Sequence, residues 1–207
     1  MRKLGIVLAF VVWCYFNIQF SGNRNSLTDK KKDLKETAEF INSPKVQKRE
    51  LSERVKCILS IAKNEVGVRE SGGNNKGRRI GEYLKVTGLT EGYAWCAAFV
   101  CWVFEQCGTR HPASAWSPTV AQYNIVYKKG SIFHNRFPSS SESVVYVFGI
   151  YKPYLKRVGH TGIVSEIRKS AIITYEGNTN GQGSREGDGV ESLIRSKKTI
   201  YCLSAYD

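Results

Sequence analysis

The chain has 207 residues, of which 42% are hydrophobic and four are tryptophan, so it can form one domain of ordinary size plus an N-terminal extension. Its formal net charge of +13 predicts an anionic partner, such as nucleic acid, an acidic membrane surface or an anionic cell-wall polymer. The basic residues are scattered along the chain, and neither a zinc-finger spacing nor an RNA-binding aromatic signature is present. These features argue against nucleic acid as the partner.

Residues 1–22 have the pattern of an export signal. Arg2 and Lys3 precede an apolar run that extends from Leu4 to Phe16, which is the arrangement of a secretory leader. The chain is therefore expected outside the cytoplasm, in the periplasm or the extracellular space. The segment around Ser21 lacks the small residues of a good cleavage site, so a cleaved signal peptide and an uncleaved anchor, which would tether the protein to the inner membrane, both stay open. The polar residues 23–44 predict a charged linker or weak helix.

From residue 45 onward the pattern becomes that of a folded domain, and helices come first. An amphipathic helix is expected from Lys45 to Val66, followed by a glycine-rich loop over 67–77 and a short helix from Ile80 to Val86. A third helix should run from Cys96 to Cys107, with a glycine just after it as a C-cap. Because its central residues are apolar on all sides, this helix is expected to be buried.

Strands follow the helices. Ser117-Pro118 is expected to form a turn, and runs rich in β-branched and aromatic residues predict strands at 143–148, 161–167, 171–176 and 199–205. Arg168-Lys169-Ser170 should join the second and third of these strands as a hairpin. Helices followed by antiparallel strands are typical of an α+β domain.

Cys96 is the strongest candidate for chemistry. At the first turn of a helix, unpaired backbone N–H groups and the positive end of the helix dipole favour a thiolate. The alternative interpretation is a small buried hydrophobic residue, which is the commoner role of a free cysteine and the role expected for Cys57. A zinc site built from Cys96, Cys101, Cys107 and His111 is not expected, because Cys96 and Cys107 would lie about 16 Å apart along the helix. No phosphate-binding loop or dinucleotide fingerprint is present, so no metal or cofactor is predicted.

A nucleophilic thiol needs a base, and His160 is the best candidate among the three histidines. It stands near the start of a predicted strand between two glycines, which allow another group to approach closely. If the hairpin turn centres on Lys169, position 160 lies opposite 178 and position 162 lies opposite 176. Glu176 or Asn178 would then lie on the same side of the sheet as His160 and hold its imidazole.

Three sequence blocks resemble the motifs of the CHAP family, the cysteine- and histidine-dependent amidohydrolases and peptidases. They are residues 93–100 (YAWCAAFV), 159–164 (GHTGIV) and 175–179 (YEGNT), and the similarity runs from about Val55 to Tyr206. The resemblance implies a papain-like α+β fold for residues 45–207, with N-terminal helices packed on a C-terminal antiparallel sheet, and hydrolysis of amide bonds in peptidoglycan.

The resemblance also implies roles for individual residues. Cys96 would be the nucleophile, His160 the base and then the acid, and Glu176 with Asn178 the orienting groups. The chain departs from the family pattern at Ser141-Glu142-Ser143, where many members have Pro-Gly-Asp, and in the long stretch 149–158 before the histidine block.

If the Cys96 backbone N–H holds the oxyanion formed by attack on the carbonyl, Tyr93 is a candidate for the second donor. Trp95 and Trp116 are candidates for stacking on the substrate. The sequence leaves open an endopeptidase and an N-acetylmuramoyl-L-alanine amidase, a catalytically silent wall-binding module, and a cysteine protease or transferase with a protein substrate. It also leaves open the oligomeric state.

Overall fold

The computed structural model describes residues 30–32, 34–35, 37–38, 43–139, 143–180 and 187–206. Contacts divide the chain into two units, Met1–Arg49 and Glu50–Asp207. The expected export signal at 1–22 lies outside the described residues, and the described residues between 30 and 38 are helical and exposed. No helix in the described ranges is both long and apolar enough to cross a membrane.

From residue 44 onward, three helices lie where the apolar periodicity predicts them, and a short fourth helix lies where it predicts none. They are α3 (Pro44–Asn64), α4 (Arg78–Lys85), α5 (Cys96–Gln106) and the short α6 (Ser117–Ala121). The predicted end of α5 is confirmed, because Gly108 follows it in the left-handed conformation, with φ 63°. The turn expected at Ser117-Pro118 is wrong: this pair begins α6, where the missing N–H of proline removes no helical hydrogen bond.

All six strands pair antiparallel in one sheet, with the order β1-β6-β2-β3-β4-β5. The strands are β1 (Ile125–Lys128), β2 (Val145–Lys152), β3 (Arg157–Ile167), β4 (Ala171–Thr179), β5 (Gly189–Ser196) and β6 (Cys202–Tyr206). A short 3-10 turn, η1 (Pro153–Leu155), joins β2 to β3. The fold is therefore α+β, as the sequence predicts, although β1 and β5 are not predicted and β2 begins two residues later and extends further than expected.

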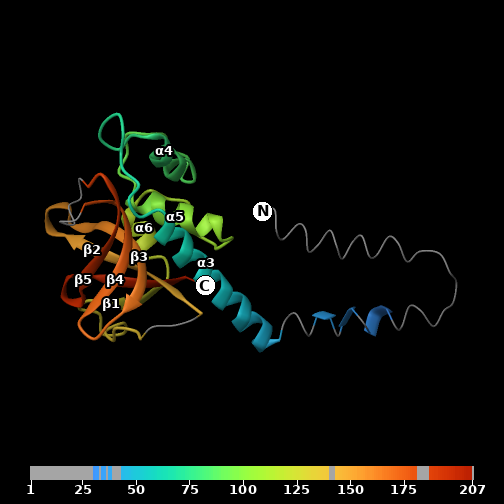
Figure 1. Ribbon diagram of the computed structural model, residues 1–207. Coiled ribbons are helices and arrows are strands. Elements are labelled where there is room, and N and C mark those ends of the chain that lie inside the picture. Colours follow the sequence, from blue (N-terminus) through green and yellow to red (C-terminus); the bar gives the residue numbers. More distant parts are fainter. Residues whose placement is uncertain are drawn as a thin grey trace. The chain divides into compact units, whose positions relative to one another are not determined.

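The core lies between α5 and the sheet. Figure 1 shows the strands gathered on one side of the second unit and α4, α5 and α6 on the other. Alternate strand positions point to opposite faces of a sheet, so Val147 and Ile163 pack with the apolar residues of α5, while Phe148 and Val164 enter a second cluster with Leu203. The buried position of α5 fixes its first residue, Cys96, against β3 and β4.

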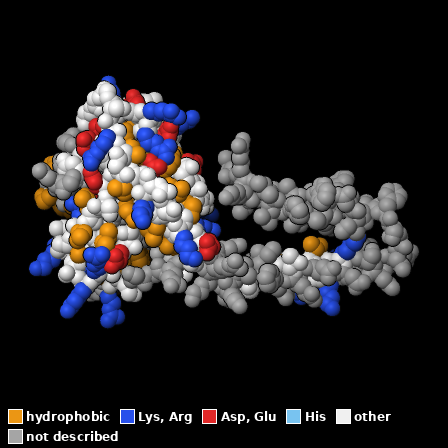
Figure 2. All heavy atoms as spheres, in the orientation of Figure 1, with side chains coloured by type: hydrophobic (Ala, Val, Ile, Leu, Met, Phe, Trp, Pro, Cys, Tyr) orange, Lys and Arg blue, Asp and Glu red, His pale blue; other side chains and the backbone are white. Residues whose placement is uncertain are grey.

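A disulfide joins Cys57 of α3 to Cys107, the residue after α5. The expectation that Cys57 serves only for packing is therefore wrong. The three free thiols in the described residues, Cys96, Cys101 and Cys202, are all buried. On the outside, Figure 2 shows lysine and arginine side chains spread over the visible face, in agreement with their scattered positions in the sequence.

Candidate active site

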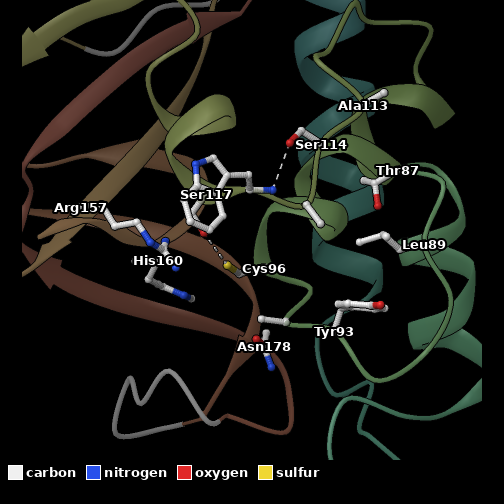
Figure 3. A pocket seen from close by; sticks show the side chains of 14 residues that line it. Thr87, Leu89, Tyr93, Cys96, Ala113, Ser114, Ser117, Arg157, His160 and Asn178 are labelled. Atoms are coloured by element: carbon white, nitrogen blue, oxygen red, sulfur yellow. Dashed lines mark hydrogen bonds between the residues drawn. The ribbon is translucent and has the colours of Figure 1, made fainter. Parts of the chain in front are cut away.

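Cys96 is the first residue of α5 and lines a cavity of about 450 Å³. Only 4% of the residue is exposed. Its Sγ lies 3.3 Å from the hydroxyl oxygen of Ser117, the first residue of α6, and Figure 3 shows this pair beside His160. The start of the helix thus presents the thiol to the cavity together with free backbone N–H groups.

His160 lies within β3 and connects the thiol to a carboxylate. Its Nε2 is 2.7 Å from Oε2 of Glu176, and both side chains are buried. Because Nε2–H donates to this carboxylate, Nδ1 is the ring nitrogen left for another partner, and His160 lines the same cavity as Cys96. The structure therefore brings the three residues together: His160 lines the cavity with Cys96 and is hydrogen-bonded to Glu176.

The register of the β3–β4 hairpin explains how His160 meets Glu176. A turn centred on Lys169 would set position 167 opposite 171. Near the turn, Ile167 instead pairs with Ile172, a shift of one residue. A bulge at Ser165 then shifts the pairing back, so that Ile163 faces Tyr175. Continued along the strands, this register sets position 162 opposite 176, as the sequence reasoning expects.

Two further residues hold the Glu176 carboxylate. Arg195 of β5 donates from Nε to Oε1 at 2.8 Å, and the hydroxyl of Thr174 also donates to Oε1. A buried carboxylate needs such partners because desolvation otherwise favours its neutral form. Sequence reasoning missed Arg195, since its strand was not predicted and no local motif marks it.

The pKa shifts describe a thiolate facing an imidazolium. Burial alone would raise the pKa of Cys96, but the hydrogen bond and charge of His160, with smaller contributions from Ser117 and the Thr161 backbone, lower it. Burial would lower the pKa of His160, but hydrogen bonds to Cys96 and Glu176 raise it to about 9. For Glu176, burial is outweighed by Arg195 and His160, which lower its pKa to about 2. These shifts favour a thiolate at Cys96 and a proton on His160.

Asn178 has different partners from those the sequence suggested. Its amide donates to the side-chain oxygen of Asn75 at 3.1 Å and to the carbonyl of Gly187 at 2.9 Å. Its oxygen accepts from the backbone N–H of Trp95 at 3.3 Å, so it supports the residue just before the nucleophile. The structure thus gives Glu176 and not Asn178 the hydrogen bond to His160.

The backbone of β4 accounts for this difference. The β4–β5 pairing shifts between Glu176 and Thr179, and within this bulge Asn178 takes the left-handed conformation with φ 54°. Asparagine tolerates that conformation better than most residues, and a bulge changes the direction of the side chain. Asn178 therefore lies outside the regular pairing that places Glu176 beside His160, although it still lines the cavity.

Residues 88–178 match the family model of the CHAP domain. Over these residues the chain is similar to a CHAP domain. No curated protein and no solved structure matches the chain.

The CHAP domain supports cell-wall hydrolase activity of the amidase or peptidase type in general. The matched segment includes Cys96, His160 and Glu176 and ends at Asn178. Arg195 lies beyond it, so the Glu176 carboxylate depends on a strand outside the matched residues.

The aromatic residues near Cys96 divide into two groups. Tyr93 is 55% exposed and Trp116 is 52% exposed, and both line the cavity. Trp95 is fully buried, stacks on Tyr83 and donates its indole N–H to Glu70 at 2.8 Å. The expectation that Trp95 contacts substrate is therefore wrong, because tertiary packing places its ring in the core.

Ser117 is the other residue of this site that sequence reasoning missed. The sequence predicts a turn at Ser117-Pro118, but a serine followed by proline is also typical of the first residues of a helix. Only the packing of α6 beside the start of α5 brings its hydroxyl to the Cys96 thiol, and no sequence spacing reports that contact.

Proposed function

We propose that this protein is an exported, cysteine-dependent peptidoglycan hydrolase that cleaves an amide bond, as an endopeptidase or an N-acetylmuramoyl-L-alanine amidase. The observation that carries the proposal is that Cys96 and His160 line one open cavity, with His160 hydrogen-bonded to the buried carboxylate of Glu176. A nucleophile, a base and an orienting group in this order are the parts that nucleophilic amide hydrolysis requires.

The first half of the proposed reaction forms a thioester. The Cys96 thiolate attacks the carbonyl carbon of the amide, a C–S bond forms, and the carbonyl oxygen becomes an oxyanion. The imidazolium of His160 then gives its proton to the amide nitrogen as the C–N bond breaks and the amine leaves. Glu176 keeps the ring in the tautomer and orientation that this transfer needs.

The second half hydrolyses the thioester. Neutral His160 takes a proton from water, the resulting hydroxide attacks the acyl carbon, and the C–S bond breaks. The products are a carboxylic acid group on the substrate and the regenerated thiolate–imidazolium pair.

The oxyanion needs hydrogen-bond donors in both halves. The backbone N–H of Cys96 is one proposed donor, because the first N–H groups of a helix have no intrahelical partner. The exposed phenol of Tyr93 is proposed as the second donor.

Location and partner belong to the same proposal. We assign residues 1–22 to export and possible tethering, 23–44 to a linker and 45–207 to the catalytic domain. The Cys57–Cys107 disulfide supports an oxidising compartment such as the periplasm or cell exterior. The charge of +13 favours encounter with an anionic wall polymer.

The proposal predicts that Cys96→Ala abolishes the release of new amino groups from purified peptidoglycan. The matched control is Cys101→Ala, which removes a buried free thiol from the same helix, one whose pKa burial raises to about 11. That variant is expected to keep its activity. Undiminished amine release by Cys96→Ala would contradict the proposal, and mass spectrometry of the released muropeptides would identify the bond.

Thiol labelling separates an enzyme from a silent wall-binding module. Iodoacetamide reacts with thiolates, so Cys96 is expected to react near neutral pH much faster than Cys101 or Cys202, whose pKa values burial raises to about 11 and about 12. Equal, slow labelling of all three thiols would favour the silent module.

A further inference from the structure

A bulge in β3 places a charged residue beside His160. In the β2–β3 pairing, Ile150 faces His160 and Lys152 faces Arg157, so one additional residue, Gly159, lies in β3 between them. Residues three apart in a regular strand point to opposite faces, but the bulge puts Arg157 and His160 on the same face. Both line the cavity that contains Cys96.

Gly159 is the residue that this arrangement requires. A Cβ at this position would lie 2.6 Å from Cγ of Lys152 and 2.9 Å from Cδ1 of Leu155. The η1 turn and Lys156, which takes the left-handed conformation with φ 53°, lead the chain into the bulge. The long stretch 149–158 noted in the sequence therefore forms the hairpin that brings Arg157 to the cavity.

The surroundings of Arg157 leave its charge without a carboxylate partner. Its guanidinium carbon lies 3.8 Å from the centre of the Trp116 ring, and its Nη1 donates to the carbonyl of Val158 at 2.8 Å. Among the described residues, no Asp or Glu lines the cavity or pairs with Arg157. Figure 3 shows the side chain extending toward the end of the cavity where His160 and Cys96 lie.

We propose that Arg157 binds a carboxylate of the substrate next to the scissile amide bond, with Trp116 as the platform that holds the guanidinium. This inference rests on the proposed function and names the substrate class: stem peptides with a free carboxylate, in preference to peptides in which the same group is a carboxamide. Stacking on an aromatic ring leaves the in-plane N–H groups of a guanidinium available, and their fork matches the two oxygens of a carboxylate.

A pair of muropeptide substrates that differ only in carboxylate or carboxamide tests the proposal. The wild-type kcat/KM is expected to be roughly 10- to 100-fold higher for the carboxylate form, the range of one charge-assisted contact. Arg157→Gln should abolish this preference by lowering kcat/KM for the carboxylate form alone, and Arg157→Lys should restore part of it.

The matched control is Arg168→Gln. Arg168 directly follows the far end of β3, is exposed and pairs with Glu166, so its substitution removes the same charge about 30 Å away along the strand. It should leave the preference unchanged. If Arg157→Gln lowers kcat/KM equally for both substrates, or if the wild type does not discriminate between them, the proposal is wrong.

Binding to the Cys96→Ala protein separates this inference from the proposed activity. Calorimetric titration with the same two muropeptides needs no turnover, and tighter binding of the carboxylate form, lost in Cys96→Ala/Arg157→Gln, supports the carboxylate site. Equal affinity for the two forms overturns it. Absence of hydrolysis by the wild type together with discriminating binding would contradict the hydrolase and retain the site.

Discussion

Cys96 and His160 share one proton, and the residues around them determine where it resides. The pKa of Cys96 is lowered and that of His160 is raised to about 9, so each group favours the charged form of the other. Glu176 stays ionised because Arg195 and His160 hold its pKa at about 2. The residues around Cys96 therefore favour its thiolate form.

This arrangement predicts a bell-shaped dependence of kcat/KM on pH. Activity should fall on the acidic side as the Cys96 thiolate is protonated, and on the alkaline side near pH 9 as His160 loses its proton. In Glu176→Gln, the imidazolium loses its anionic partner, so the pKa of His160 falls, that of Cys96 rises and the two limbs approach each other.

Measuring kcat/KM across pH checks this prediction. The maximum for Glu176→Gln is expected to fall by roughly 10²- to 10⁴-fold, the usual contribution of a positioned acid or base. Glu176→Asp keeps the charge and serves as the control, with an alkaline limb close to that of the wild type. An alkaline limb that does not move in Glu176→Gln would argue against the role given to this carboxylate.

At the scale of elements, close packing of β4 on α5 fixes the thiol. Gly177 has no side chain where the two elements meet, and a Cβ there would lie 2.6 Å from Cζ3 of Trp95 and 2.7 Å from Cβ of Phe99. Any larger residue must displace the start of α5. The glycine therefore serves the site although it touches no reacting atom.

Gly177→Ala is expected to lower the free energy of unfolding by roughly 1–3 kcal/mol, because overpacking strains a close-packed core. It should also slow the labelling of Cys96 by iodoacetamide. The control is Gly81→Ala in α4, where the nearest atom to a new Cβ is 3.5 Å away and alanine favours the helix. Denaturant unfolding of the two variants should give opposite shifts, and equal stability would contradict the packing argument.

The sequence predicted the elements that have a strong local pattern and missed those that depend on pairing. The buried helix that begins at Cys96 and the hairpin that carries His160 were readable because their apolar runs are long. The four-residue β1 is only half-buried throughout, and much of β5 alternates between half-buried and exposed residues, so neither has the continuous apolar run of a buried strand.

The sequence did not predict the β-bulges, and these determine which side chains face the site. The single-residue shifts at Gly159 and Ser165 decide which side chains share a face, yet each depends on contacts with a neighbouring strand. The sequence could predict that His160 and Glu176 lie on the same face of the sheet. It could not predict the partners of Asn178 or the presence of Arg157 in the cavity.

For the whole molecule, the Cys57–Cys107 disulfide is the covalent link that bears on stability. It connects cysteines 50 positions apart in sequence and joins α3 to the end of the helix whose other end carries the nucleophile. Such a link stabilises a fold chiefly by restricting the unfolded chain.

The Cys57→Ala/Cys107→Ala variant is expected to lose about 2–4 kcal/mol of unfolding free energy. Denaturant unfolding measured with and without reductant provides the check, because reductant should destabilise the wild type and leave the double variant unchanged. A wild type that is indifferent to reductant would show that the link contributes little.

The ion pair between Glu176 and Arg195 links the candidate site to the stability of β5. β5 stands at the end of the strand order, and the segment 67–70 bonds to residues 188–190 at its start, so Arg195 lies near the other end of the strand from this contact. Edge strands exchange their amide hydrogens by local opening at a lower free energy than global unfolding. When β5 detaches, Glu176 loses its counter-ion while the helices and the disulfide remain in place. The proposed activity is then expected to be lost when this one strand opens, so folded but inactive molecules should accumulate before the chain unfolds.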